Sequence, residues 1–179
     1  MNRNFVIDTG RIRCQPFTKD DIDSLNGIIK VDPEIRRFFS FGSLLSFFAR
    51  LSGYDCCPMV VYRHLPNMST IDSQMIGYIN GYHYGGGEML VEFFVAKDFR
   101  RNKYAAEMVH AFTKHMRFSG YFTFRFHVEE ENAACIAFME HIGAVHCAIE
   151  DFEDEETPGQ KRQYRMYKLT LKKWKRCVE

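Results

Sequence analysis

The middle of this 179-residue chain reads as a strand, a positively charged turn and a helix. Residues 89–96 form an almost continuous apolar run, which is typical of a buried strand. The turn that follows, residues 97–103, is rich in Lys and Arg. Apolar residues then recur every three or four positions from Tyr104, which predicts a helix that stops before Gly120. The N-terminus of a helix attracts anions, so this turn either binds a phosphate or pyrophosphate or is an ordinary solvated basic turn.

Glu92 is the one charged residue in the apolar run, so we expect it in a largely buried strand. A buried carboxylate needs a cation, a hydrogen-bond network or a wet cleft. In a cleft, Glu92 could act as a general base. Alternatively, it reaches the edge of the sheet or pairs with Arg125.

The next segment, residues 121–128, alternates between two faces and predicts a second strand. Phe122, Phe124, Phe126 and Val128 would share the apolar face. Asn132 then serves as a natural N-cap for a helix that runs to Gly143. The middle of the chain is therefore strand, turn, helix, strand, Asn, helix, strand.

This order and spacing resemble the GCN5-related N-acetyltransferases (GNAT), above all the branch that acetylates the N-termini of ribosomal proteins and similar amines. Several segments carry the resemblance, in the family's order: Arg11–Asp21, Asp32–Phe38, Ile76–Ile79, Arg100–Ala105 followed by Glu107, Asn132–Cys135 and Glu140–Ala144. It covers about residues 9–171. It implies one α/β (α+β) domain over residues 1–179, with a mixed, mostly antiparallel sheet flanked by helices. The central strands, residues 89–96 and 122–128, would splay apart to admit acetyl-CoA.

The resemblance also implies roles for individual residues in an N-acetyltransferase acting by direct attack in a ternary complex. Glu92 would take the proton of the amine, and Cys135 would lie near the sulfur; these two are the catalytic candidates. The backbone N–H groups of two strand residues would hold the thioester carbonyl, the turn would wrap the pyrophosphate, and an asparagine would contact pantetheine. These cofactor-binding candidates are Phe94, Val95, Arg100, Arg101, Asn102, Lys103, Tyr104, Ala105 and Asn132.

The chain departs from the family pattern at several positions. Lys103 and Arg101 replace glycines of the pyrophosphate turn, and a residue with a Cβ holds such a turn only if its φ stays in an allowed region. Lys103 could compensate with a charge-assisted contact to phosphate. Cys135 replaces a serine, and Met139 replaces the tyrosine that protonates the departing thiolate in other branches. The alternative function is a catalytically degenerate GNAT-fold module that binds acyl-CoA or another protein.

Composition limits the classes of partner that we expect this protein to bind. The formal net charge of +1 does not favour nucleic acid, and no apolar run approaches a membrane span. The amino terminus lacks a signal-peptide core and the cysteines form no CxxC pair, so we expect reduced thiols and a cytoplasmic protein. No His or Cys shows metal-ligand spacing, so we expect no metal. We expect acetyl-CoA and an amine acceptor as partners, and a homodimer is possible. Neither the acceptor nor the group that protonates the thiolate follows from the sequence.

The flanking segments predict further elements. Residues 5–17 form a strand, Thr18 caps a helix, and Asp32-Pro33 begins a second, short helix. Residues 38–51 are strongly apolar and are either core or an apolar wall of the acceptor groove. Residues 59–62 and 75–79 form paired strands, as do 144–149 and 163–171. The acidic connection 150–159 is either a solvated loop or a rim that steers a cationic amine.

Overall fold

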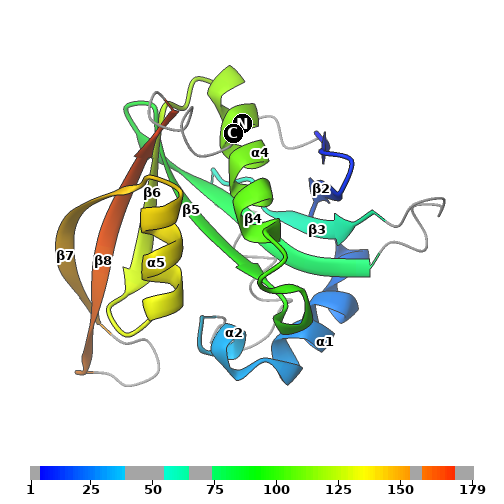
Figure 1. Ribbon diagram of the computed structural model, residues 1–179, viewed down its shortest axis with the longest axis horizontal. Coiled ribbons are helices and arrows are strands. Elements are labelled where there is room, and N and C mark those ends of the chain that lie inside the picture. Colours follow the sequence, from blue (N-terminus) through cyan, green and yellow to red (C-terminus); the bar gives the residue numbers. More distant parts are fainter. Residues whose placement is uncertain (1–4, 39–54, 65–73, 154–158, 172–179) are drawn as a thin grey trace. The chain divides into compact units, whose positions relative to one another are not determined.

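The computed structural model describes residues 5–38, 55–64, 74–153 and 159–171. In these residues, eight strands form one sheet in the order β1-β2-β3-β4-β5-β6-β8-β7 (Figure 1). β5 and β6 are parallel, whereas β1–β2, β2–β3, β3–β4, β6–β8 and β7–β8 are antiparallel. The predicted mixed, mostly antiparallel sheet is therefore confirmed. Most of the apolar segment 38–51, residues 154–158 of the acidic connection and the basic tail lie outside the described residues.

The described residues fall into two compact units, Met1–Tyr82 with Phe93–His115 and His83–Glu92 with Met116–Glu179, which we describe separately. A single domain over the whole chain remains a prediction. In chain order the elements are β1 Ile7–Asp8, β2 Ile12–Pro16, η1 Lys19–Asp21, α1 Ile22–Val31, α2 Pro33–Phe38, β3 Met59–Arg63, β4 Gln74–Gly85, β5 Glu88–Val95, η3 Lys97–Phe99, α4 Tyr104–Phe118, β6 Thr123–Glu129, α5 Ala133–His141, β7 Val145–Glu153 and β8 Lys161–Thr170.

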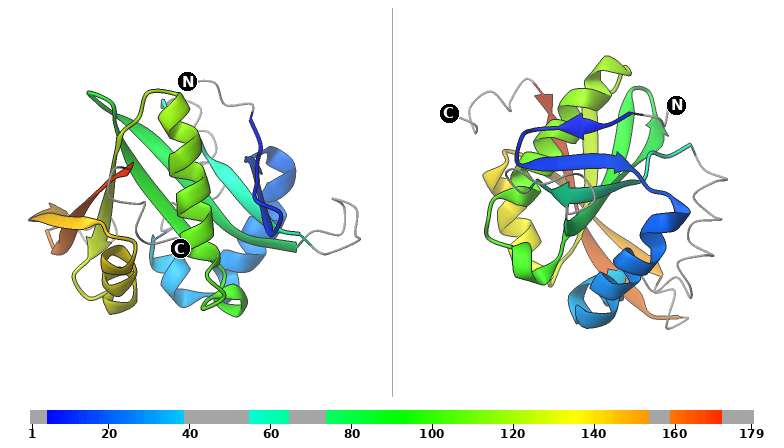
Figure 2. Two further views of the ribbon diagram at one scale, coloured as in Figure 1. Left: turned by 45° about the horizontal axis from the view of Figure 1, so that its top comes forward. Right: turned by 90° about the vertical axis from the view of Figure 1, so that its right-hand side faces the viewer.

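The first unit begins with a hairpin in place of the single strand predicted over residues 5–17. The chain turns at Gly10, whose φ of 86° suits a residue without a Cβ and whose N–H donates to Asp8 Oδ1 at 2.9 Å. β1, β2 and β3 then lie side by side (Figure 2, right). The predicted starts of α2 at Pro33 and of α4 at Tyr104 are confirmed. α4 also ends before Gly120, as its periodicity indicated.

One apolar cluster holds the first unit together. Its buried members come from α1, α2, β3, β4 and β5 and from the segments just after β2 and just before β3: Phe17, Leu25, Ile29, Ile35, Cys56, Val60, Met75, Tyr78 and Phe94. Phe17 meets the ring of Tyr78 edge to face, and Phe94 stacks on the same Tyr78 ring with the ring centroids 5.9 Å apart. Such pairs add to the free energy of burying their area. The cluster therefore fixes the end of β5 against α1 and α2.

The second unit is built on β6, β8 and β7, with α5 in the connection between β6 and β7 (Figure 1). Phe124, Phe126 and Val128 are buried, as the alternation predicted. Phe122 is 56% exposed, so its placement on the same face was wrong. The cause is that β6 begins only at Thr123. The N–H of Phe122 instead donates to the carbonyl of Gly87, in the turn between β4 and β5, at 2.9 Å.

β4 and β5 approach each other unusually closely at Gly77. A Cβ placed on Gly77 would lie 2.4 Å from the carbonyl oxygen of Phe94, closer than any real contact. The N–H of Ala96 donates to Ile76 O at 2.8 Å one residue further along. Only glycine fits between these backbones. Gly77 thus sets the position of Phe94 and Val95 in β5.

We expect Gly77→Ala to lower the free energy of unfolding by about 1–3 kcal/mol, because the new methyl group overpacks a backbone contact. Thermal unfolding followed by circular dichroism measures this loss. Gly27→Ala is the matched control, because nothing lies within 4 Å of a Cβ at this position in α1. That change should stabilise by about 0.5–1 kcal/mol, since alanine favours a helix over glycine. Equal stability of the two variants would contradict the close approach of β4 and β5.

Candidate functional site

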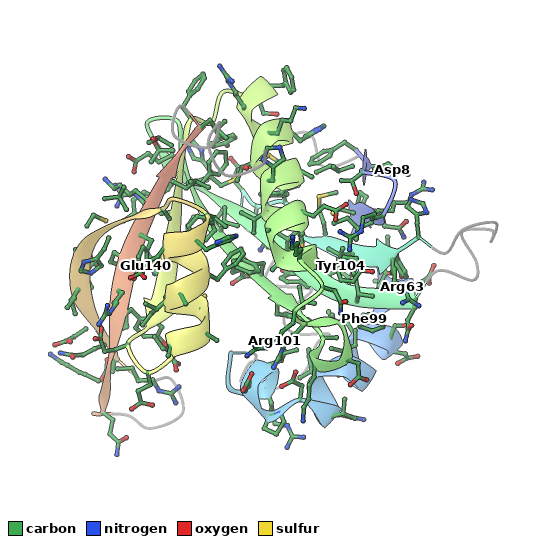
Figure 3. The ribbon with its side chains drawn as sticks, viewed as in Figure 1. Asp8, Arg63, Phe99, Arg101, Tyr104 and Glu140 are labelled. Carbon is green, nitrogen blue, oxygen red and sulfur yellow. The ribbon has the colours of Figure 1, made fainter. Side chains whose placement is uncertain are left out.

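The turn before α4 contains two non-glycine residues in the left-handed region, Arg101 with φ 63° and Lys103 with φ 65°. These are the two positions at which the sequence departs from glycine. The left-handed conformation costs a residue with a Cβ roughly 1–2 kcal/mol. At both positions the backbone therefore holds a conformation that glycine would adopt without this cost. Figure 3 shows Arg101 and Tyr104 at the start of α4.

Arg11, from the turn between β1 and β2, supports this turn from one side. Its Nη2 donates to the carbonyl of Asn102 at 3.0 Å, and its guanidinium lies 4.7 Å from the ring centre of Tyr104. Its Nη1 pairs with Glu107 at 3.1 Å, and Thr9 Oγ1 donates to the same carboxylate at 2.5 Å. One arginine therefore contacts the turn, the first helical residue and the first turn of α4.

Arg100 supports the turn from within. Its Nε donates to Val95 O at 3.0 Å, its Nη1 to Glu34 at 2.5 Å, and its Nη2 to Asp32. Asn102 closes the turn, because its Nδ2 donates to the carbonyls of Phe99 and Arg100 at 3.3 and 3.1 Å. Strained backbone persists where surrounding contacts over-determine it. The arginines and Asn102 supply such contacts here.

The start of α4 carries the features of an anion site. The first backbone hydrogen bond of the helix runs from Glu107 N–H to Lys103 O at 3.1 Å, so the N–H groups of Tyr104, Ala105 and Ala106 precede it. Such groups and the helix dipole favour a negative ligand. Arg101, Asn102 and Lys103 are exposed, so the two cationic side chains face solvent at the same turn.

The end of β5 supplies backbone donors. Phe94 and Val95 are both 8% exposed. Since the N–H of Ala96 points to β4 and successive N–H groups of a strand alternate, the N–H of Val95 points away from β4. A backbone N–H that points away from the neighbouring strand can stabilise a developing oxyanion in a dry environment. The roles of Phe94 and Val95 stay predictions.

Glu92 is half-buried in β5, which lies between β4 and β6 and is not an edge strand. Arg125, the alternative partner of Glu92, donates from Nε to the carboxylate of Glu88, and its guanidinium lies 4.6 Å from the ring centre of Tyr84. The role of Glu92 as a base stays a prediction.

α5 begins at the predicted cap. Asn132 Oδ1 accepts from the N–H of Cys135 at 3.0 Å, so the capping interpretation is confirmed, and its Nδ2 is the group left for a ligand carbonyl. Burial raises the pKa of the Cys135 thiol to about 12. Cys135 is therefore a neutral thiol at pH 7, and a poor nucleophile. Met139 is 1% exposed and belongs to the core.

A cavity of about 700 Å³ in the first unit contains none of the predicted site residues. Its lining comes mainly from α1, η3 and the start of β4, and includes Asp32, which contacts Arg100. In the part of the chain that the structure describes, no cluster of three or more His, Cys, Asp or Glu is placed to hold a metal ion. No helix of the described residues is long and apolar enough to cross a membrane.

Comparison with known proteins identifies the family. Residues 11–145 match the model of the acetyltransferase (GNAT) domain, about three quarters of the chain, so this chain belongs to the GNAT acetyltransferases and is an acyltransferase. No curated protein matches the sequence.

Solved structures of low sequence identity share the fold. A GNAT-family acetyltransferase from Bacillus anthracis is 16% identical, with a TM-score of 0.72 over 93% of this chain and 98% of the other. Mycobacterium smegmatis RimJ, solved in complex with CoA-disulfide, is 15% identical, with a TM-score of 0.68 over 90% and 82%. The ribosomal-protein-S18-alanine N-acetyltransferase of Escherichia coli is 14% identical, with a TM-score of 0.64 over 89% and 93%. At these identities the likeness concerns the fold.

The sequence did not predict which residues support the turn. Arg11 appeared there only as part of the amino-terminal segment, and Asp32 and Glu34 only as the start of a helix. The partners lie 91, 68 and 66 positions apart in the chain. Local patterns carry no signal for such pairs.

The left-handed φ of residue 103 predicts how its substitutions affect stability. Lys103→Gly should leave the stability of the ligand-free protein unchanged or slightly raised, because relief of about 1–2 kcal/mol of strain offsets glycine's greater loss of entropy. Lys103→Val should lower it by about 1 kcal/mol or more, because a β-branched residue tolerates this region poorly. Chemical denaturation measures both.

Lys97→Val, at an exposed position of η3, is the control for the loss of a lysine. If Lys103→Val is as stable as this control, residue 103 does not hold a left-handed conformation in solution.

Proposed function

We propose that this acyltransferase moves the acetyl group of acetyl-CoA to a primary amine, by direct attack in a ternary complex. The observation that carries the proposal is the exposed, left-handed turn at the N-terminus of α4, held by Arg11 and Arg100. A pyrophosphate suits this turn, because backbone N–H groups, a helix dipole and two cations meet there. Asn132 is the candidate contact for pantetheine.

The chemical step needs a deprotonated amine. Its nitrogen attacks the thioester carbonyl carbon, a C–N bond forms, and the C–S bond breaks to release coenzyme A. The N–H groups of Phe94 and Val95 would stabilise the charge on the carbonyl oxygen. Glu92 would take the amine proton directly or through a water molecule, and the thiolate would be protonated as it leaves.

Cys135 fits this direct route as a neighbour of the sulfur. A thiol whose pKa is raised to about 12 by burial is not the nucleophile that an acetyl-cysteine intermediate requires. We therefore assign it a packing or hydrogen-bonding role beside the thioester.

The acceptor is a protein N-terminus or a small amine, and the site of action is the cytoplasm. The name of the structural relative from E. coli, a ribosomal-protein-S18-alanine N-acetyltransferase, motivates the first acceptor class. A second candidate function is a degenerate module that binds acyl-CoA or a protein without turnover. It is favoured by the strained Arg101 and Lys103 and by Met139, which supplies no proton for the thiolate.

Two measurements test the proposal. Saturating acetyl-CoA should raise the melting temperature, because it binds the folded state alone. Release of free thiol from acetyl-CoA should then be followed across a panel of small amines and peptides with free N-termini. Thermal stabilisation without turnover on any acceptor would favour the module, and the absence of both would exclude the acetyltransferase and the acyl-CoA-binding module.

Glu92→Gln should reduce turnover by about two or more orders of magnitude, because it keeps the shape of the side chain and removes the base. The affinity for acetyl-CoA, measured by calorimetric titration, should stay near that of the wild type. Glu88→Gln is a control for the loss of a β5 carboxylate, since Glu88 pairs with Arg125. Unchanged turnover in Glu92→Gln at saturating acceptor would make Glu92 a structural residue.

Cys135→Ala should retain turnover within about tenfold, because a neutral thiol contributes at most a hydrogen bond to the reaction. Intact-mass spectrometry of the wild type after incubation with acetyl-CoA alone should show no acetyl adduct on Cys135. A stable, kinetically competent adduct at this cysteine would replace direct attack with a two-step route.

A further inference from the structure

Arg100 opens the segment that resembles a pyrophosphate-binding motif, yet its guanidinium is directed at the protein. Nε, Nη1 and Nη2 donate to the carbonyl of Val95 and to the carboxylates of Glu34 and Asp32. The side chain is 32% exposed, and each of its three nitrogens has an acceptor in the first unit. The planar donor fork of arginine suits two carboxylates at once.

Asp32 is the buried partner of this ion pair. Its side chain is 2% exposed, and its Oδ2 accepts from Arg100. Its Oδ1 accepts from the N–H groups of Glu34 and Ile35 at 3.1 and 3.4 Å, which are the first donors of α2. One carboxylate therefore caps α2 and binds the turn. A buried charge is strongly penalised without its partner, so this pair resists separation.

We propose that Arg100 is a positioning residue: its guanidinium fastens the cofactor turn to α2 through Asp32 and Glu34, and the pyrophosphate is left to the backbone N–H groups and Lys103. This inference rests on the proposed binding of acetyl-CoA at the turn. The conformations of the turn and of α2 are therefore coupled. Cofactor binding at the turn then stabilises α2, and a change at α2 alters cofactor affinity by the same coupling.

The two possible roles of Arg100 differ in their dependence on salt and on Asp32. A guanidinium on the pyrophosphate adds a partly exposed charge contact, so its removal makes binding less sensitive to ionic strength. Release of that guanidinium from Asp32 would then maintain or improve binding. A positioning residue gives the opposite results: its removal weakens binding at every salt concentration, and removal of Asp32 has the same effect.

The experiment is calorimetric titration of acetyl-CoA into the full chain at low and high salt. The variants are Arg100→Gln, Asp32→Asn, their double variant, and Lys103→Met as the reference for a lost phosphate contact. Asn at position 32 keeps the Oδ1 cap of α2. Glu34→Gln is the milder variant, because this side chain is 75% exposed and its loss should not prevent folding. Hydrogen exchange of peptides covering residues 32–38 and 100–106 reports the coupling.

We expect Arg100→Gln and Asp32→Asn each to weaken binding by about tenfold, a typical size for coupled elements, with the salt dependence of the wild type retained. The double variant should be no weaker than the weaker single variant, since both remove one interaction. Glu34→Gln should show a smaller loss. Acetyl-CoA should slow exchange in residues 32–38 of the wild type but not of Arg100→Gln.

Other results overturn the inference. If Arg100→Gln flattens the salt dependence as Lys103→Met does, while Asp32→Asn and Glu34→Gln bind like the wild type, the guanidinium contacts the phosphates. If acetyl-CoA protects α2 equally in the wild type and in Arg100→Gln, the contacts of Arg100 do not couple the turn to α2. Failure of the wild type itself to bind acetyl-CoA is a separate outcome, which refutes the proposed function and with it this use of Arg100.

Discussion

The left-handed backbone at Arg101 and Lys103 is the constraint on which the candidate site depends. Neither residue favours this conformation, so it exists because other contacts impose it. Arg11 holds the carbonyl of Asn102, and Arg100 holds the beginning of the turn against α2 and the end of β5. A turn that is imposed in this way presents its N–H groups in a fixed direction before any ligand arrives, which is the condition for a preorganised anion site.

The same contacts neutralise some charges of this region within the protein and leave others facing solvent. Glu107 lies in the first turn of α4, where a carboxylate would oppose the binding of an anion. Arg11 neutralises it, as Asp32 and Glu34 neutralise Arg100. Within residues 100–103, all of which the structure describes, the exposed charged side chains are those of Arg101 and Lys103. The field that a ligand would meet therefore comes mainly from these two side chains and from the helix itself.

Local patterns predicted much of the fold. The period of the apolar residues located α4, and the Asp32-Pro33 pair located the start of α2, because both signals act over a few neighbouring residues. Asn132 was predicted as a cap for the same reason. The errors arose where a single turn decides the outcome. Gly10 divides the first strand, and Phe122 leaves β6 to follow the turn at Gly87. The partners of Arg100 and Arg125 depend on the tertiary fold, which periodicity does not encode.

Side chains in the left-handed turn also act on the unfolded chain. Glycine at positions 101 and 103 would leave the unfolded state with a much larger range of φ and ψ, and folding would have to remove that freedom. Arginine and lysine begin with fewer accessible conformations, so part of the strain of the native turn is compensated before folding starts. The turn of this protein is thereby stiffer than a glycine turn of the same shape. A ligand that binds there has less of the chain to order, so binding costs the protein less conformational entropy.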